Sequence, residues 1–281
     1  DAGPDSGDDE VEAVVIAASS TAHADLVESA AEAGKAIFCE KPMAMTLTDA
    51  DRAIAAAEGA GVPLQVGFNR RFSADFAAAH EVVSSGGVGT PQLMRSLTRD
   101  PGLADPGSVP PWTIFTQTLI HDFDALLWLN PGARAVSVHA TADALVAPEF
   151  KSQGLLDTAV VVITFDNGAI ATADASFSAA YGYDVRAEVF GSAGMVTVDP
   201  GRRTAMVHST RTGRSAETVR GDVDLFLDAY TAEFAEFADA VRTKRAPAVT
   251  GEDARRALAI ALACIESVQS GAPSPVEEVG R

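Results

Sequence analysis

The amino-terminal quarter alternates short apolar runs with amphipathic segments, and this alternation constrains the fold most. Residues 11–18 (VEAVVIAA) form a continuous apolar run that is typical of a strand buried on both faces of a parallel sheet. The pattern places three strands at 11–18, 36–39 and 64–68. A helix over 22–33 and a second helix capped at Thr48 separate them. Strand, helix, strand, helix, strand predicts an α/β domain with right-handed crossovers.

The rest of the chain changes to a period-two pattern. Helices are expected at 73–85 and 115–129, on either side of a strand at 92–98 and a proline-rich loop at 100–111. Further strands are expected at 135–141, 158–165, 169–177, 185–190 and 195–198, and two helices with apolar stripes close the chain. We therefore expect two domains, residues 1–66 and residues 67–281, the second an α/β domain with an open, largely antiparallel sheet.

Charge and cysteine content narrow the class of protein. The formal net charge of −18 repels phosphate backbones, which argues against a nucleic-acid partner. Cys39 and Cys264 fit neither a disulfide framework nor a zinc site and indicate a reducing, cytoplasmic compartment. No apolar run is long enough for a membrane span, and the first ten residues lack the apolar core of a secretory signal.

The first candidate site is Glu40-Lys41-Pro42, which directly follows the second strand. Ligands of open α/β sheets bind outside the carboxyl ends of the strands, where Lys41 falls. Pro42 imposes an extended or turned backbone on Lys41 and is a candidate for a cis peptide bond. The plainer alternative is a solvated loop lysine.

The second candidate is the run from Gln117 to Asp124. Spacing of four and three residues places Gln117, His121 and Asp124 on one face of a helix. A neutral imidazole is a natural base for a hydroxyl proton. The alternatives are a core or capping histidine, or a metal ligand, although the sequence singles out no third and fourth ligand, so no metal is predicted.

The third candidate combines two polar turns. One is Gly67-Phe68-Asn69-Arg70-Arg71-Phe72, and the other is Ala180-Tyr181-Gly182-Tyr183-Asp184. Their hydroxyl, amide and guanidinium groups suit a polyhydroxylated ligand, and ordinary polar turns are the alternative.

Taken together, these motifs resemble the Gfo/Idh/MocA family of NAD(P)-dependent oxidoreductases. The resemblance runs in order through AVVIAASSTAHA, AGKAIFCEKPMA, GFNRRF, LIHDFDALLWL and YGYDVRAEVFGSAGMV and covers nearly the whole chain. The GFNRRF and YGYD segments are most similar to those of inositol and sugar dehydrogenases in this family. The resemblance implies a partial Rossmann domain, with its doubly wound parallel sheet, followed by the open-sheet domain.

The resemblance also implies roles for individual residues. Lys41 and His121 would be the catalytic residues, in substrate contact and proton transfer. Cofactor candidates, for NAD or NADP, are Ser19, Thr21, His23, Glu40 and Lys41. Substrate candidates are Arg70, Gln117, Asp124, Tyr181 and Tyr183. The implied reaction is oxidation of a secondary alcohol of a cyclic polyol or sugar, in a homo-oligomer without nucleic-acid or membrane partners.

Two departures from the family pattern affect these expectations. No G-x-G-x-x-G precedes the first strand, so we expect the chain to begin inside the Rossmann domain. Inositol-type members usually carry Asp four residues before the histidine, after a Gly-Gly pair, whereas this chain has Gln117, Trp112 and Thr113. A glutamine orients the imidazole but does not raise its basicity.

These departures leave three functional hypotheses. The first is the NAD(P)-dependent dehydrogenase, with Gln117 marking a subgroup that has another substrate. The second is a non-catalytic or impaired binding or regulatory protein on the same scaffold. The third is a related lyase or hydrolase that uses bound NAD transiently.

Overall fold

The computed structural model describes residues 10–199 and 206–277. The chain divides into two compact units. The first contains residues up to 69 together with residues 230–259, and the second contains residues 70–229 and 260–277. Within the described ranges, none of the helices is both long and apolar enough to cross a membrane.

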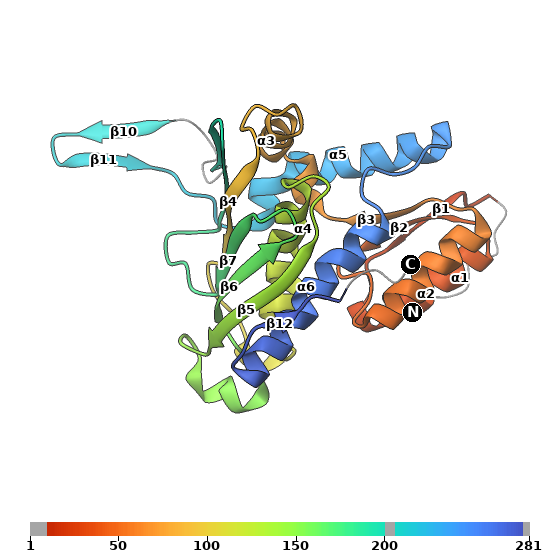
Figure 1. Ribbon diagram of the computed structural model, residues 1–281, viewed down its shortest axis with the longest axis horizontal. Helices are drawn as coiled ribbons and strands as arrows, with labels where there is room; N and C mark the ends of the chain where they lie inside the picture. The colour runs from red at the N-terminus through yellow and green to blue at the C-terminus, as the bar shows by residue number, and fades with distance from the viewer. Residues whose placement is uncertain (1–9, 200–205, 278–281) are drawn as a thin grey trace. The chain divides into compact units, whose positions relative to one another are not determined.

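The first unit is built on a three-stranded parallel sheet. Its strands β1 (Ala13–Ile16), β2 (Ala36–Glu40) and β3 (Leu64–Gly67) lie in the order β1-β2-β3. The connecting helices α1 (His23–Glu32) and α2 (Leu47–Ala60) lie side by side in Figure 1. The α/β pattern predicted from the alternating segments is confirmed, with each strand within two residues of its predicted ends.

The helix α2 begins two residues earlier than predicted. Its amino-terminal cap is Thr46, whose hydroxyl accepts a hydrogen bond from the Asp49 amide at 3.1 Å. The prediction of Thr48 as the cap was therefore wrong, because Leu47 is buried in the first turn and extends the apolar face of the helix. Gly61 ends the helix in the left-handed conformation, with φ of 68°.

Aromatic packing joins residues 230–259 to the first sheet. Phe38 of β2 is fully buried, and its ring centroid lies 4.5 Å from that of Phe234 and 5.8 Å from that of Phe237. Both partners are on α5 (Asp222–Thr243). Gln65 adds a hydrogen bond of 3.1 Å from its side-chain amide to the Glu233 carbonyl. The first compact unit thus contains a helical segment that the expected domain division placed in the second.

An ion pair attaches the following helix to the same unit. Arg255 of α6 (Gly251–Ser270) is buried and donates to both carboxylate oxygens of Asp51 on α2. Two hydrogen bonds in one plane fix both side chains in a single relative orientation.

The second unit contains a seven-stranded sheet in the order β12-β5-β6-β7-β4-β8-β9. Its strands are β4 (Pro91–Arg99), β5 (Ala135–Asp143), β6 (Thr158–Phe165), β7 (Ile170–Ser176), β8 (Asp184–Gly191), β9 (Met195–Val198) and β12 (Ser274–Pro275). Among its described strand pairs, β4 and β7 alone run parallel. The expected open, largely antiparallel sheet is confirmed.

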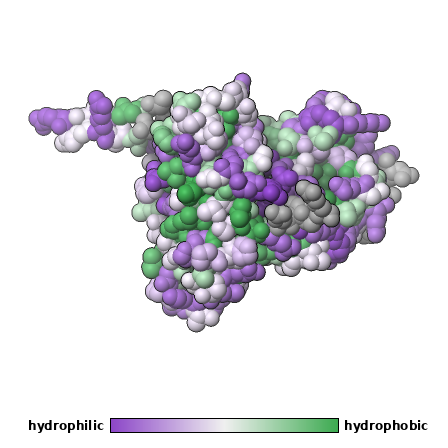
Figure 2. All heavy atoms as spheres, in the orientation of Figure 1, coloured by the Kyte–Doolittle hydropathy of each residue, from purple (hydrophilic) through white to green (hydrophobic). Residues whose placement is uncertain are grey.

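Alternation along these strands gives the sheet one buried and one exposed face. Helices α3 (Ala74–Ser84) and α4 (Ile120–Trp128) belong to this unit, and α4 packs on β4 and β7. The other face carries exposed apolar side chains, which Figure 2 shows among polar ones over the region of the strands. These exposed side chains include Leu93, Val160, Val162, Ile170, Phe190 and Met195.

A separate hairpin was not predicted. Strands β10 (Val207–Thr210) and β11 (Gly213–Ala216) pair with each other and extend away from the seven-stranded sheet in Figure 1. All eight of their residues are exposed. Because no side of this hairpin is buried, its sequence lacks the apolar alternation that identifies a strand.

Candidate active-site residues in the two units

Polar side chains gather at the carboxyl ends of the first-unit strands. Ser19 and Thr21 follow β1, are exposed, and have hydroxyl oxygens 3.1 Å apart. Glu40 ends β2 and is half-buried, as is Lys41 after it. These residues occupy the edge of the sheet where open α/β folds bind ligands.

The Glu40 carboxylate lies close to the backbone of Lys41 and of Gly67. The Lys41 amide donates to its Oε2 at 3.3 Å. A Cβ on Gly67, at the end of β3, would lie 3.0 Å from the same oxygen, so this position favours glycine. Burial raises the pKa of Glu40, and the positive charges of Lys41 and His23 oppose that shift without cancelling it.

His23 makes two contacts with backbone carbonyls. The ring is 1% exposed, and its Nδ1 lies 2.8 Å from the Pro42 oxygen while its Nε2 lies 3.0 Å from the Ala18 oxygen. The Lys41-Pro42 peptide bond is cis, as Pro42 suggested. The structure thus places His23, a predicted cofactor ligand, beneath the two loops that carry the other cofactor candidates.

This edge of the sheet fits one end of a dinucleotide. The exposed hydroxyls of Ser19 and Thr21 can bind ribose or amide groups, and the Glu40 carboxylate can accept from hydroxyls. Over the described ranges, no cluster of three or more His, Cys, Asp or Glu side chains could hold a metal ion.

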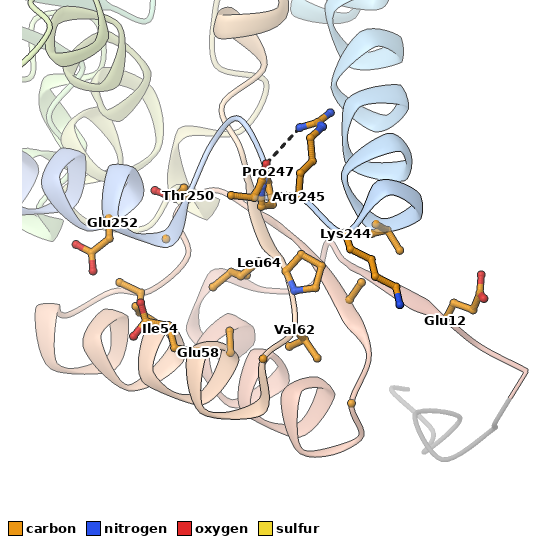
Figure 3. Close-up of a pocket in the computed structure, with 18 residues that line it drawn as sticks. Glu12, Ile54, Glu58, Val62, Leu64, Lys244, Arg245, Pro247, Thr250 and Glu252 are labelled. Carbon is orange, nitrogen blue, oxygen red and sulfur yellow. Dashed lines mark hydrogen bonds between the residues drawn. The ribbon is translucent and has the colours of Figure 1, made fainter.

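A cavity of about 700 Å³ lies at the opposite, amino-terminal end of the same strands. Figure 3 shows it between the start of β3, marked by Leu64, and the connection from α5 to α6, which carries Lys244 and Arg245. Arg245 is engaged by Glu236 and Asp239. Since the loops with Ser19 and Lys41 follow the other strand ends, we do not assign this cavity to the cofactor.

In the second unit, the predicted helix over 115–129 is not uniform. Residues Ile114–Leu119 form a π-helix, and α4 begins at Ile120. Hydrogen bonds in a π-helix span five residues, so the backbone at Gln117 is not that of the regular α-helix predicted from the sequence. That Gln117, His121 and Asp124 share one face stays a prediction. Gln117 and His121 are both half-buried.

The residue before this helix has a left-handed backbone. Trp112 has φ of 63°, a conformation that costs a side-chain-bearing residue roughly 1–2 kcal/mol. Trp112 is one of the two positions at which the inositol-type enzymes that the sequence resembles usually carry glycine. The departure noted in the sequence therefore falls where the backbone favours glycine, two residues before the π-helix.

Arg70 lies in a buried network with α4 and β4. It is 2% exposed and donates to the Asp122 carboxylate at 2.8 Å and to the Thr98 hydroxyl at 2.6 Å. Asp122 also accepts from the hydroxyls of Ser96, at 2.5 Å, and Thr98, at 2.7 Å. Burial lowers the pKa of Arg70, but Asp122 and Tyr183 more than compensate and raise it overall.

A second ion pair lies beside the first. Arg71 donates to both oxygens of Asp124, at 2.9 and 2.5 Å. The Arg71 guanidinium also lies 5.6 Å from the Trp128 ring, which stacks on His80 with centroids 4.0 Å apart. Asp124 is fully buried, so this pair attaches α4 to the segment after β3.

The two candidate tyrosines have different environments. Tyr181 is 52% exposed and donates to Asp184 at 2.8 Å. Tyr183 is half-buried, packs edge-on to Phe226, and hydrogen-bonds with Arg70. Burial chiefly raises the pKa of the Tyr183 hydroxyl, with the nearby Asp100 and Asp222 adding to the shift and Arg70 opposing it, so this group stays protonated.

Sequence reasoning missed how two motifs combine. The consecutive arginines of GFNRRF pair with the two aspartates of HDFD, Arg70 with Asp122 and Arg71 with Asp124. The two arginines of one motif and the two aspartates of the other have opposite charges, and this match was the sequence signal that could have predicted the pairing. Asp122 was not among the predicted residues because adjacency to His121 alone gave it no role.

Two family models match successive parts of the chain. A sequence model described as "Oxidoreductase family, NAD-binding Rossmann fold" matches residues 5–68. A model described as "Oxidoreductase family, C-terminal alpha/beta domain" matches residues 112–277. Both models represent the Gfo/Idh/MocA family, and the second alone covers more than half of the chain.

Individual relatives are similar over most of their length. A Thermotoga maritima myo-inositol 2-dehydrogenase is 37% identical over 280 residues, spanning 97% of this chain and 82% of its own. A crystal structure of a probable dehydrogenase from Thermotoga maritima has a TM-score of 0.92 and 36% identity, covering 98% of this chain and 83% of that chain.

A third similarity is to a ligand-bound structure. Scyllo-inositol dehydrogenase from Lactobacillus casei with bound NAD(H) and scyllo-inositol has a TM-score of 0.91 and 25% identity, covering 96% of this chain and 82% of that chain. Sequence and fold agree, and the chain belongs to the Gfo/Idh/MocA family of oxidoreductases.

Proposed function

We propose that this protein is an NAD-dependent dehydrogenase that oxidises a secondary hydroxyl of an inositol-like cyclic polyol to a ketone. The observation that carries the proposal is the polar cluster at the carboxyl ends of β1 and β2, in the segment that matches an NAD-binding Rossmann domain. The similarity to inositol dehydrogenases, one of them with cofactor and scyllo-inositol bound, indicates the substrate class.

Two side chains are assigned to the chemistry. When bound, NAD⁺ would be held by Ser19, Thr21 and Glu40 and would supply the hydride acceptor for the carbinol carbon. His121 accepts the proton that leaves the substrate hydroxyl, and Lys41 donates a hydrogen bond to the substrate oxygen. One C–H and one O–H bond break as the C=O double bond forms, so the electrons leave with the hydride.

The remaining predicted residues are assigned to binding. Ser19, Thr21 and Glu40 are proposed cofactor contacts. Among the substrate candidates, the structure favours Gln117, which is half-buried, over Arg70 and Asp124, which are buried in ion pairs. Tyr181 and Tyr183 complete the proposed substrate set.

Substitution of the two chemical residues tests the proposal. In Lys41→Met and His121→Gln, kcat with NAD⁺ and an inositol should fall by about 10²–10⁴-fold. His208 is exposed on β10, so His208→Gln is a matched control that should keep wild-type kcat. The Kd for NAD⁺, followed by fluorescence, should change little in His121→Gln. A loss in kcat smaller than tenfold in either variant would contradict the assigned roles.

Gln117 favours a second candidate function. A glutamine stands where inositol-type members usually have Asp, which is consistent with a binding or regulatory protein that does not turn over substrate. Isothermal titration with NADH and an inositol would then show binding in a protein that produces no NADH. Measurable turnover by the wild-type protein excludes this alternative.

We also propose a homo-oligomer formed through the exposed face of the seven-stranded sheet. Leu93 on this face pairs in register with Ile170 on one side and Phe190 on the other, and all three are exposed. Apolar surface of this kind is typical of interfaces. A reducing, cytoplasmic location is proposed from Cys39 and Cys264, which are buried free thiols.

A further inference from the structure

We propose that His23 is a positioning residue that ties the loop carrying Lys41 to the loop carrying Ser19 and Thr21. The inference rests on the proposed function for the identity of Lys41 as a catalytic residue. It goes beyond that function by assigning His23 a part in placing both the cofactor loop and the catalytic loop, with no contact of its own with the nicotinamide.

The first support is the place of the two carbonyls that His23 contacts. Ala18 lies in the segment between β1 and the helical turn Ser20–Ala22, and Pro42 lies two residues after the end of β2. Both segments leave the carboxyl edge of the parallel sheet. At 2.8 and 3.0 Å, the two ring nitrogens are within hydrogen-bond distance of one carbonyl in each segment. Because a carbonyl oxygen only accepts, the ring bonds to both segments at once when both of its nitrogens carry a proton, and it then bridges two loops that no backbone hydrogen bond between them joins.

The second support is burial. His23 is 1% exposed and begins α1, so its backbone is held by the helix and its ring is enclosed. Pro42 and Met43 are buried as well. If the buried Pro42 carbonyl loses its donor, it cannot turn to bulk water, so its loop must move to find a new partner.

The third support is that the Pro42 carbonyl, which His23 holds, is close in sequence to the Lys41 amine. We call this hydrogen bond between His23 and Pro42 the anchor. Lys41 shares a peptide bond with Pro42, so the anchored carbonyl is one residue from the Lys41 Cα. A displacement of about 1 Å at a catalytic group can reduce the rate by about 10²-fold. The contact of His23 with Pro42 should therefore affect kcat, whereas its contact with Ala18 should affect cofactor binding through Ser19 and Thr21.

Two amide substitutions separate these contacts. Asparagine places its amide nitrogen near the position of Nδ1, and glutamine places it near Nε2. His23→Asn therefore retains a donor for Pro42, and His23→Gln retains one for Ala18. We expect His23→Gln to lose at least tenfold in kcat with less than threefold change in the Kd for NAD⁺. We expect the reverse in His23→Asn, a higher Kd with kcat within threefold of wild type.

Amide exchange, which does not depend on turnover, tests the hydrogen bond between His23 and Pro42 directly. In hydrogen–deuterium exchange of the full chain without ligand, the Met43 and Ala44 amides should exchange faster in His23→Gln than in His23→Asn. Thermal midpoints of both variants and of the exposed His208→Gln control show how much each change affects the whole fold.

The outcomes separate this inference from the proposed function. Equal exchange at Met43 and Ala44 in the two variants, or parallel losses in kcat and Kd that follow the thermal midpoints, would overturn the positioning role. If exchange differs as expected but the wild-type protein does not turn over, the anchor stands and the catalytic assignment fails. If Lys41→Met is inactive while both His23 variants match wild type in kcat, Kd and exchange, the catalytic assignment stands and the anchor fails.

Discussion

Removing the Asp122 carboxylate should destabilise the protein severely, and the size of the effect follows from the contacts of this group. Asp122 is fully buried and accepts hydrogen bonds from Arg70, Ser96 and Thr98. Asp122→Ala leaves the Arg70 guanidinium buried without its counter-ion. Breaking a buried pair in this way costs about 3–5 kcal/mol. The Ser96 and Thr98 hydroxyls also lose their acceptor, so we expect the free energy of unfolding to fall by about 5 kcal/mol, near the upper limit of that range.

The double substitution distinguishes ionic coupling from simple loss of packing. In Arg70→Met with Asp122→Leu, apolar side chains of similar volume replace both charges, and no buried charge is left unpaired. We expect the double variant to be more stable than Asp122→Ala by about 2 kcal/mol or more, since replacing a buried pair by apolar groups is often close to neutral.

Urea unfolding at neutral pH is the assay. Midpoints are compared for wild type, Asp122→Ala, Asp122→Leu, Arg70→Met and the double variant, with the slope checked for constancy so that the differences report stability. The cycle of Asp122→Leu, Arg70→Met and their double variant should give a coupling free energy of at least about 2 kcal/mol. Additive effects of these two single substitutions, or a loss below about 1 kcal/mol in Asp122→Ala, would contradict the ionic coupling of Arg70 and Asp122.

Two other perturbations test the backbone and the electrostatics. Trp112→Gly should be more stable to urea than Trp112→Ala by about 1 kcal/mol, because φ of 63° favours glycine. At positions with ordinary φ, alanine is the more stable of the two. Equal stability of the two variants would argue against backbone strain at Trp112. Glu40→Gln should be more stable than wild type in thermal melts at neutral pH. Burial raises the pKa of Glu40, so folding is most favourable below the ordinary pKa of a glutamate, and this stability is lost as pH rises through the raised pKa. The advantage of Glu40→Gln over wild type should therefore shrink toward acid pH, and an advantage that grows there would contradict this reasoning.

The parts of the fold that depend on local pattern were predictable from the sequence. Residues 36–39 are apolar throughout because both faces of this part of the strand are covered. The strands Thr158–Phe165 and Met195–Val198 were predicted with the bounds that the structure gives. The exposed hairpin Val207–Ala216 has no buried side, so no periodicity identifies it.

The parts that depend on packing were not predictable. The spacing of Gln117, His121 and Asp124 fits an α-helix, and only the backbone shows that Ile114–Leu119 is a π-helix. Arg70 and Asp122 are 52 residues apart, so their pairing follows from the placement of two elements and not from either motif. His23 was predicted as a cofactor-binding residue, and its contacts with the Pro42 and Ala18 carbonyls needed coordinates.

The most direct test of the central claim is to follow the hydride itself. The protein is incubated with NAD⁺ and an inositol that carries deuterium at the carbinol carbons, and the cofactor is recovered for mass spectrometry and NMR. For a polyol dehydrogenase we expect one deuterium at the nicotinamide C4 for each ketone formed. A protein that binds NAD⁺ at saturation but transfers no deuterium to it from any inositol isomer would contradict the proposed dehydrogenase function.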